Sequence, residues 1–343
     1  MIPKKQLEQI KEELVYCKRP IFFFHDDPDG LCSFLLLYRF VGAGKGVAVK
    51  AVPRLTKDIF AKKAEEYGAD KIFVLDLSEI EEDFVRAVKS PIIWIDHHDP
   101  VKLQGVKYFN PRVQNRDEYS PVSYWCYKVL ERDLWIATVG CIGDAFIPPF
   151  FGKFVEQYPG LADIKTNDVL KIIYETELGK LVRIFSFSLL GSTKQTNKVM
   201  KVLTRIQTPY EILSQSTNQG KFIYKQFLNV QDEYQRIMAE AKKVKSDKNV
   251  FFFTYKSSTS LTKDIANELT YLKRDTVIIV GREKSGELKL SLRWTKNIKT
   301  PLQKALKHVQ GYGGGHEKAC GAVIKAADAE TFISVIREEI SGK

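Results

Sequence analysis

The stretch Ile-Phe-Phe-Phe-His-Asp-Asp-Pro-Asp-Gly at residues 21–30 decides the expected fold, because an apolar run passes directly into ionisable side chains. Residues 21–24 are typical of a buried strand, and the proline and final glycine favour a sharp turn into a helix. His25, Asp27 and Asp29 alternate along the segment, so in an extended chain they would project from one side. These acids are either ligands of one or two ions or an acidic turn that caps the helix.

Other apolar runs in the first half of the chain end in the same way. Asp76 follows a run that starts at Lys71, and Asp96 follows Pro-Ile-Ile-Trp-Ile. Strand and helix patterns alternate, which predicts an open α/β sheet with a ligand crevice beyond the carboxyl ends of its strands. The expected strands are 21–24, 47–53, 71–76 and 91–96, and the expected helices are 31–41, 57–67 and 80–89. The ionisable residues would therefore meet at one edge of the sheet.

Each of these ionisable residues has a second interpretation. Asp76 is either a metal ligand or the N-cap of the next helix. Three consecutive ionisable residues, Asp96, His97 and His98, suit neither a core nor a turn, so we expect His97 to be a ligand. Asp96 or His98 would then orient it or contact the substrate. Asp144 ends an apolar helical stretch and is either a ligand or a surface residue at a helix end.

Histidine placement favours a metal site. Four of the five histidines fall inside three short motifs, and two of these motifs add carboxylates beside the imidazoles. Imidazole and carboxylate are the ligands that divalent first-row metal ions use. The five cysteines show no CxxC spacing, so neither a zinc ribbon nor a disulfide framework is expected.

The second half of the chain predicts a helical region and a smaller α/β domain. Residues from about 115 to 245 are mostly helical in pattern, ending in an amphipathic helix that is either a connector or a dimerising coiled coil. Strands are expected at 249–254, 276–281 and 287–294, with helices near 260–273 and 298–309. We therefore expect domains at 1–190 and 248–343, joined by a helical connector at 191–247.

Charge and hydropathy limit the function classes. Lys and Arg total 53 against 42 Asp and Glu, a net charge of +11 that favours an anionic partner such as nucleic acid. The sequence contains neither an apolar run long enough to span a membrane nor a signal-peptide core, so a cytoplasmic location is expected. Lys194, Lys198, Lys201 and Arg205 recur at helical spacing. They are either a solvated face or a stripe that tracks a single-stranded backbone.

Taken together, the motifs resemble those of the DHH phosphoesterase superfamily, which includes RecJ nucleases, nanoRNases, cyclic-dinucleotide phosphodiesterases and family II pyrophosphatases. The resemblance lies in the order HxDxDG, a later aspartate, DHH and then GDA. The C-terminal region looks like the DHHA1 substrate-binding domain. The residues that carry this second likeness are Ser291-Leu292-Arg293, Gly313-Gly314-Gly315-His316 and Gly321.

The resemblance implies a phosphoesterase with two metal ions, usually Mn2+ with Mg2+ as a substitute, in a cleft between the DHH and DHHA1 domains. Asp76 would bridge the ions, and Asp96 and His98 would take catalytic roles. In the DHHA1 region, a glycine turn would present N–H groups to a phosphate, with Arg293 and His316 beside it. The implied metal ligands are Asp27, Asp29, Asp76, His97 and Asp144, with His25 next to them, and the implied phosphate-binding residues are Gly313, Gly314, Gly315, His316 and Arg293.

The first motif also separates subfamilies. Members that act on small substrates commonly show HxNxDxD, whereas this chain has Asp27 in place of the Asn and Leu31 in place of the last Asp. HxDxDG is similar to the RecJ group, especially its archaeal branch. We therefore expect an exonuclease acting on single-stranded DNA or RNA. The alternatives are an enzyme for short substrates (a nanoRNase, a phosphoadenosine-phosphate phosphatase or a cyclic-dinucleotide phosphodiesterase) and a silent replication scaffold. The archaeal likeness implies a replication or repair partner, such as a GINS-type complex or a helicase.

Overall fold

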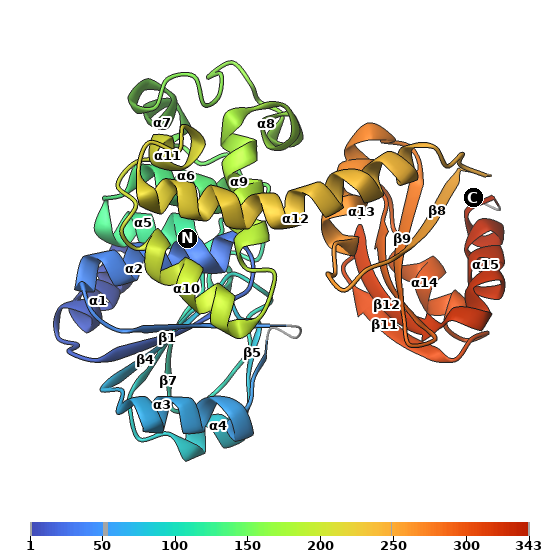
Figure 1. Cartoon of the computed structure of the whole chain (residues 1–343). Helices are drawn as coiled ribbons and strands as arrows, with labels where there is room; N and C mark the ends of the chain where they lie inside the picture. Colours follow the sequence, from blue (N-terminus) through green and yellow to red (C-terminus); the bar gives the residue numbers. More distant parts are fainter. Residues whose placement is uncertain (1, 51–53, 248, 342–343) are drawn as a thin grey trace. The chain divides into compact units, whose positions relative to one another are not determined.

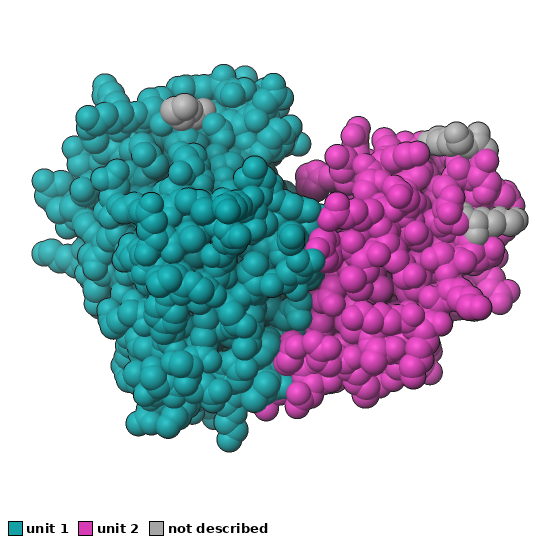
Figure 2. Space-filling model, turned by 90° about the horizontal axis from the view of Figure 1, so that it is seen from above, with its two compact units in different colours: residues 1–228 teal, residues 229–343 magenta. Residues whose placement is uncertain are grey.

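The computed structural model describes residues 2–50, 54–247 and 249–341. The chain divides into two compact units, residues 1–228 and 229–343, which Figure 2 shows in different colours. The boundary falls inside the long helix α12 (Asn218–Lys242). Among the described residues, no helix combines the length and the apolar character needed to cross a membrane.

The first unit is built on a five-stranded parallel sheet, which confirms the α/β expectation. Its strand order is β2-β1-β4-β6-β7, and every neighbouring pair is parallel. The last strand, β7, was not expected, because only one of its four residues is buried and the segment is not a continuous apolar run. The tail of the expected strand at 47–53, residues 51–53, lies outside the described residues. The strands are β1 (Pro20–His25), β2 (Lys45–Val49), β4 (Lys71–Leu75), β6 (Ile92–Ile95) and β7 (Val106–Phe109).

Helices cover both faces of this sheet (Figure 1), and alternate phenylalanines of β1 pack against each layer. Phe22 contacts Phe34 of α2 (Pro28–Val41) edge to face on one side. Phe23 contacts Phe84 of α4 (Glu82–Ala87) on the other side, together with helix α3 (Lys62–Tyr67). Because both faces are buried, the central strands are apolar throughout. A pair of two-residue strands, β3 (Arg54–Leu55) and β5 (Glu79–Ile80), lies apart from the main sheet.

The rest of the first unit is helical, as the sequence predicted. Helix α10 contacts β2, and helix α11 contacts α9, so residues 191–228 group with the first unit. Of these helices, only α12 continues into the second unit. The helices are α1 (Lys4–Val15), α5 (Val122–Leu130), α6 (Leu134–Gly143), α7 (Phe151–Gln157), α8 (Val169–Glu175), α9 (Glu177–Ser188), α10 (Thr193–Leu203) and α11 (Pro209–Leu213).

The second unit has a mixed five-stranded sheet in the order β11-β12-β10-β9-β8. Only β8 and β9 pair in parallel; the other neighbours are antiparallel. The buried side chains of β10 and β12 pack against α14 and α15, and α13 contacts β9 and β10. The elements are β8 (Val250–Lys256), α13 (Thr262–Leu272), β9 (Val277–Lys284), β10 (Glu287–Arg293), α14 (Lys299–Ala305), β11 (Gly311–Gly315), β12 (Ala319–Lys325) and α15 (Ala329–Ser341).

The expectation of a glycine turn in this unit was wrong. Gly311–Gly315 form the edge strand β11, paired with β12. A Cβ on Gly313 would lie 2.6 Å from the carbonyl oxygen of Gly321, and one on Gly315 would lie 2.5 Å from that of Ala319. These glycines are therefore needed for close approach of two strands.

Candidate metal centre and phosphate-binding strand

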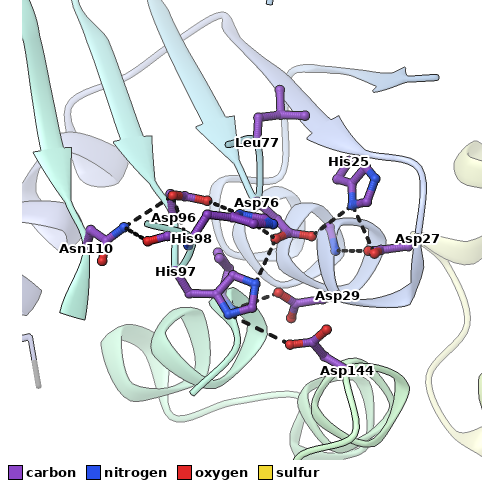
Figure 3. Close-up of polar contacts among 12 residues, drawn as sticks. His25, Asp27, Asp29, Asp76, Leu77, Asp96, His97, His98, Asn110 and Asp144 are labelled. Carbon is purple, nitrogen blue, oxygen red and sulfur yellow. Dashed lines mark hydrogen bonds and ion pairs between the residues drawn. The ribbon is translucent and has the colours of Figure 1, made fainter. Parts of the chain in front are cut away.

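Three neighbouring strands of the parallel sheet end in the predicted ionisable residues. β1, β4 and β6 lie side by side, so their carboxyl ends share one edge. His25 ends β1, Asp76 follows β4, and Asp96 to His98 follow β6. Figure 3 shows these side chains pointing toward one another from the strand ends. The sheet therefore brings together residues that lie more than seventy positions apart in sequence.

Asp76 lies at the centre of this cluster. Its side chain is 2% exposed, and its oxygens lie 3.4 Å from His25 Nδ1 and 3.3 Å from His97 Nε2. Despite these neighbours, Asp76 Oδ1 is a buried atom with no hydrogen bond. The residue adopts a left-handed conformation with φ 57°, which costs an aspartate roughly 1–2 kcal/mol. It caps no helix, since α4 begins after Glu81.

Asp27 caps a helix, which is one of the two interpretations given to it. It is the N-cap of α2, and its Oδ1 accepts a hydrogen bond of 3.1 Å from the Gly30 backbone N–H. Its other oxygen, Oδ2, lies 2.9 Å from His25 Nδ1. The turn that starts the helix thus also fixes one carboxylate oxygen toward the histidine.

Asp29 is held by the beginning of another helix. It is 1% exposed, and its two oxygens accept hydrogen bonds of 2.8 Å from the backbone N–H groups of Val122 and Ser123 at the start of α5. Burial, followed by the charges of Asp76 and Asp144, raises the pKa of Asp29 well above its usual range. The protein thus positions this carboxyl group rigidly where negative charge is costly.

Asp96 acts on His98, not on the centre of the cluster. It is fully buried and accepts hydrogen bonds from the His98 backbone N–H at 3.1 Å and from His98 Nδ1 at 2.7 Å. Asn110 Nδ2 donates to the same carboxylate at 3.2 Å and to the His98 carbonyl oxygen at 3.0 Å. With Nδ1 bonded to Asp96, Nε2 is the ring nitrogen of His98 that can meet a ligand.

His97 lies between the carboxylates of Asp76 and Asp144. Its Nε2 faces Asp76, and its Nδ1 lies 3.8 Å from Asp144 Oδ2 at the C-terminal end of α6. Burial by itself lowers the pKa of His97, but the surrounding carboxylates of Asp76, Asp144 and Asp29 outweigh burial and hold that pKa well above its usual range. The same balance, with Asp27 and Asp76, raises the pKa of His25.

The residue types and positions fit a divalent cation. Potential ligand atoms lie within 4.8 Å of one another in three sets, and Asp76 and His97 each belong to two of them. The orphaned oxygen of Asp76 and the excess of carboxylates are what a cation would neutralise. The sets are His25, Asp27 and Asp76; Asp76, His97 and His98; and Asp29, His97 and Asp144.

Two residues that support the cluster were not predicted from the sequence. Asn110 and Tyr108 belong to the unexpected strand β7 or follow it directly, and the Tyr108 hydroxyl lies 3.4 Å from Asp96 Oδ2. Asn110 Nδ2 also donates to that hydroxyl at 2.7 Å. Recognising Val106–Phe109 as a strand would have placed both residues at the same sheet edge.

In the second unit, Arg293 lies at the end of β10 and is held by the protein. Its Nε donates to Asn267 Oδ1 at 2.7 Å, and its Nη1 donates to the carbonyl oxygens of Leu292 at 2.9 Å and Cys320 at 3.2 Å. The guanidinium orientation is thus set by α13 and by two strands. Arg293 pairs with Ala319 of β12, the strand next to the glycine strand.

The glycine strand exposes backbone groups at the sheet edge. His316 and Ala319 exchange backbone hydrogen bonds, and Gln310 accepts one from Lys325. Hydrogen-bonding direction alternates along an antiparallel strand, so the N–H groups of Gly313 and Gly315 point away from β12. His316 follows this strand and is exposed.

The predicted basic stripe lies on the first unit. Lys194, Lys198 and Lys201 are exposed on α10, whereas Arg205 lies past the end of that helix. Lys198 Nζ lies 5.0 Å from the ring centroid of Phe222. Three of the four cations therefore share one helix, and the fourth extends the stripe beyond it.

Comparisons with known proteins agree with this architecture. Residues 21–143 match the DHH family, N-terminal domain, and residues 249–342 match the DHHA1 domain. No curated protein matches the sequence.

The chain is also similar to solved structures. RecJ from Thermus thermophilus in complex with Mn2+ matches with a TM-score of 0.67 and 14% identity, over 99% of this chain and 55% of the other. An exonuclease RecJ bound to manganese matches with a TM-score of 0.62 and 13% identity, over 99% and 95% of the two chains.

A third structure, the pGpG-specific phosphodiesterase PggH from Vibrio cholerae, matches with a TM-score of 0.51 and 14% identity, over 95% and 99% of the two chains. This chain spans about half the length of the Thermus RecJ chain. With a DHH domain followed by a DHHA1 domain, it belongs to the DHH/DHHA1 proteins and has a RecJ-like fold.

Proposed function

We propose that the chain is a metal-dependent exonuclease that hydrolyses single-stranded DNA, or RNA, to nucleotides. The observation that carries the proposal is the position of Asp76, whose buried carboxylate lies between His25 and His97 with one oxygen unbonded. A buried carboxylate is stabilised only by a partner, and the neighbouring imidazoles and carboxylates are side-chain types that bind divalent metal ions.

Two ions, Mn2+ or Mg2+, would each be held by one set of residues. Asp76 of one set lies beside His97 of the other set. When bound, such ions polarise a phosphoryl group and activate water for in-line displacement. Asp76, which faces ligands of both sets, would be the bridging carboxylate. One set is His25, Asp27 and Asp76, and the other is Asp29, His97 and Asp144.

His98 would bind an oxygen of the scissile phosphate through Nε2. Asp96 fixes the ring by accepting from Nδ1, and Asn110 fixes the backbone of the same residue. Because the imidazole is oriented before substrate arrives, its hydrogen bond to the phosphate carries little reorganisation cost. Asp96 is therefore a positioning residue.

In the second unit, Arg293, His316 and the outward N–H groups of Gly313 and Gly315 would bind a second phosphate of the substrate. Edge N–H groups and a fixed guanidinium are suited to phosphate oxygens. Gly314 leaves open space above the strand, since nothing lies within 4 Å of the position of its Cβ. A nucleotide backbone could therefore approach this strand closely.

A single strand is the favoured substrate because a net charge of +11 and the cations of α10 suit a polyanion longer than one nucleotide. The similarity to PggH, titled a pGpG-specific phosphodiesterase, supports a second candidate, an enzyme for very short substrates such as dinucleotides or cyclic dinucleotides. A silent replication scaffold is the third candidate, and a replication or repair partner remains a proposal from the family resemblance.

Digestion of matched substrates tests these candidates. End-labelled single-stranded DNA, single-stranded RNA, a dinucleotide and a cyclic dinucleotide are incubated with Mn2+, with Mg2+ and with EDTA. An exonuclease shortens the long strands stepwise from one end only when metal is present. Cleavage confined to the dinucleotides would favour the second candidate, and no turnover of any substrate would favour the scaffold.

Two variants assign that activity to the metal centre. Asp76→Asn keeps the side-chain shape but removes the charge, so we expect metal-dependent turnover to fall at least a hundredfold. Asp232→Asn, at an exposed position of α12, makes the same change of charge and serves as the control. Equal turnover in both variants would contradict the proposed site.

A further inference from the structure

A pocket of about 430 Å³ lies in the first unit, at the end of the parallel sheet opposite the candidate metal centre. Lys45, the first residue of β2, lines it, whereas the metal residues lie at the carboxyl ends of the neighbouring strands. Since β2 runs for five residues, the pocket lies roughly 15 Å along the sheet from that edge. It is therefore separate from the candidate metal centre.

The pocket combines aromatic walls with positive charge. Phe34 and Met200, 2% and 4% exposed, form its apolar floor, and Tyr38 and Tyr67 add phenol rings. Lys45 and Lys201 supply two ammonium groups, and Lys45 Nζ lies 5.6 Å from the ring centroid of Tyr67. No carboxylate lines the pocket in the described part of the chain. A flat ring carrying an anionic group, such as a nucleotide, matches this lining.

Helix α10 connects the two ends of the sheet. Lys50 follows β2 at the metal-centre edge and donates to the carbonyl oxygens of Leu189 and Gly191 and to Thr196 Oγ1, at 2.8, 3.1 and 3.0 Å. These bonds fix the beginning of α10 at that edge. Lys201, in the last turn of the same helix, lines the pocket. α10 therefore contacts the edge strand β2 and extends from the metal-centre edge toward the pocket.

We propose that this pocket binds one nucleotide of a single strand whose reacting end lies at the metal centre. The base enters between the tyrosines, and the intervening phosphates follow Lys194 and Lys198 on the exposed face of α10. The inference rests on the proposed exonuclease function and deepens it, because it makes binding depend on strand length. A free nucleoside phosphate has the same chemistry, and the test separates the two sources.

Equilibrium binding in EDTA tests the pocket without requiring catalysis. Fluorescence anisotropy is measured with labelled oligothymidylates from the dinucleotide upward, and thymidine monophosphate is added as a competitor. We expect affinity to rise steeply once the strand reaches about four nucleotides, the lower limit of common single-strand sites. Shorter strands reach only the metal-centre edge and should bind weakly.

Two variants alter the pocket in different ways. Asn197→Trp places an indole into the pocket from an exposed position of α10, and Lys201→Glu reverses one of its charges. We expect each to weaken binding of long strands about tenfold, in line with the loss of one stacked base, and to leave dinucleotide binding unchanged. Lys128→Glu, at an exposed position of α5, makes the same change of charge as a control and should leave binding within twofold.

The outcomes are distinct. Wild-type affinity for long strands in both pocket variants, each with an unchanged circular dichroism spectrum, would overturn the inference. Competition by thymidine monophosphate as strong as that by the long strands would also overturn it, because the pocket would then be a site for a free nucleotide. Hydrolysis of the long strands with Mn2+ is measured on the same samples. Its absence, with length-dependent binding intact, would contradict only the proposed function and would support the pocket.

Discussion

The Asp96→Asn variant tests directly how Asp96 positions His98. Asp96 is fully buried and receives donors from the His98 ring, the His98 backbone and Asn110. Asparagine keeps one acceptor oxygen and replaces the other with an N–H donor, so at least one of these donors loses its partner. The change preserves shape and removes the charge, which isolates the electrostatic and orienting role of the carboxylate.

The expected loss of kcat follows from the hydrogen bonds that the variant would lose. A hydrogen bond to a charged group contributes about 1.5–3 kcal/mol, and the shortest one lost here is the 2.7 Å bond to His98 Nδ1. If the oriented ring acts in the transition state, kcat should fall about 10- to 100-fold while KM changes little. Loss of a partner that orients a metal-site residue commonly has an effect of this size.

Steady-state hydrolysis with Mn2+, together with thermal unfolding, measures the effect. Tyr108→Phe is the control, because its hydroxyl lies 3.4 Å from Asp96 and its removal leaves both hydrogen bonds to His98 in place. We expect less than a fivefold effect on kcat from the control. A folded Asp96→Asn variant with wild-type kcat would refute the positioning role.

Three further predictions concern stability. Glu13 pairs with Lys71 and with Lys107; burial raises its pKa, but both lysines outweigh burial and lower it below its ordinary value of 4.5. Glu13→Gln should therefore cost about 1–2 kcal/mol at pH 7 in urea unfolding, a deficit that fades as the pH falls below 4.5; a deficit independent of pH would contradict the pairing. Phe23→Ala, at a fully buried position between sheet and helices, should cost about 3–5 kcal/mol, and a loss below about 1 kcal/mol would argue against the packing. Gly313→Ala should speed amide hydrogen exchange in β11 and β12, whereas Gly314→Ala, which has open space, should not; equal exchange would show that the strands do not approach as closely as described.

The first unit was largely predictable from the sequence because its strands are buried on both faces and read as continuous apolar runs. β1, β4 and β6 are of this kind, and each ends in the residues that form the candidate centre. Parallel pairing then places those ends together, whatever their separation in sequence. The short edge strand β7 has only one buried residue, so neither it nor Asn110 beyond it could be foreseen.

The second unit was less predictable because glycine signals a turn in most contexts. In Gly311–Gly315, glycine instead permits a close strand pairing that only the neighbouring strand β12 explains. The left-handed conformation of Asp76 is equally invisible in sequence, since aspartate adopts several backbone conformations. The pocket beside α10 combines residues of α2, β2 and α3 with residues of α10, which lies far along the chain, so no local pattern brings them together.

Mn2+ binding to the purified chain tests the central claim most directly. Electron paramagnetic resonance and equilibrium dialysis report how many ions bind and whether two of them are close. We predict two Mn2+ ions per wild-type chain with a spin-coupled signal, and loss of that signal with at most one tightly bound ion in Asp76→Asn. Equal stoichiometry and an unchanged signal in Asp76→Asn would contradict a two-metal centre organised around this carboxylate.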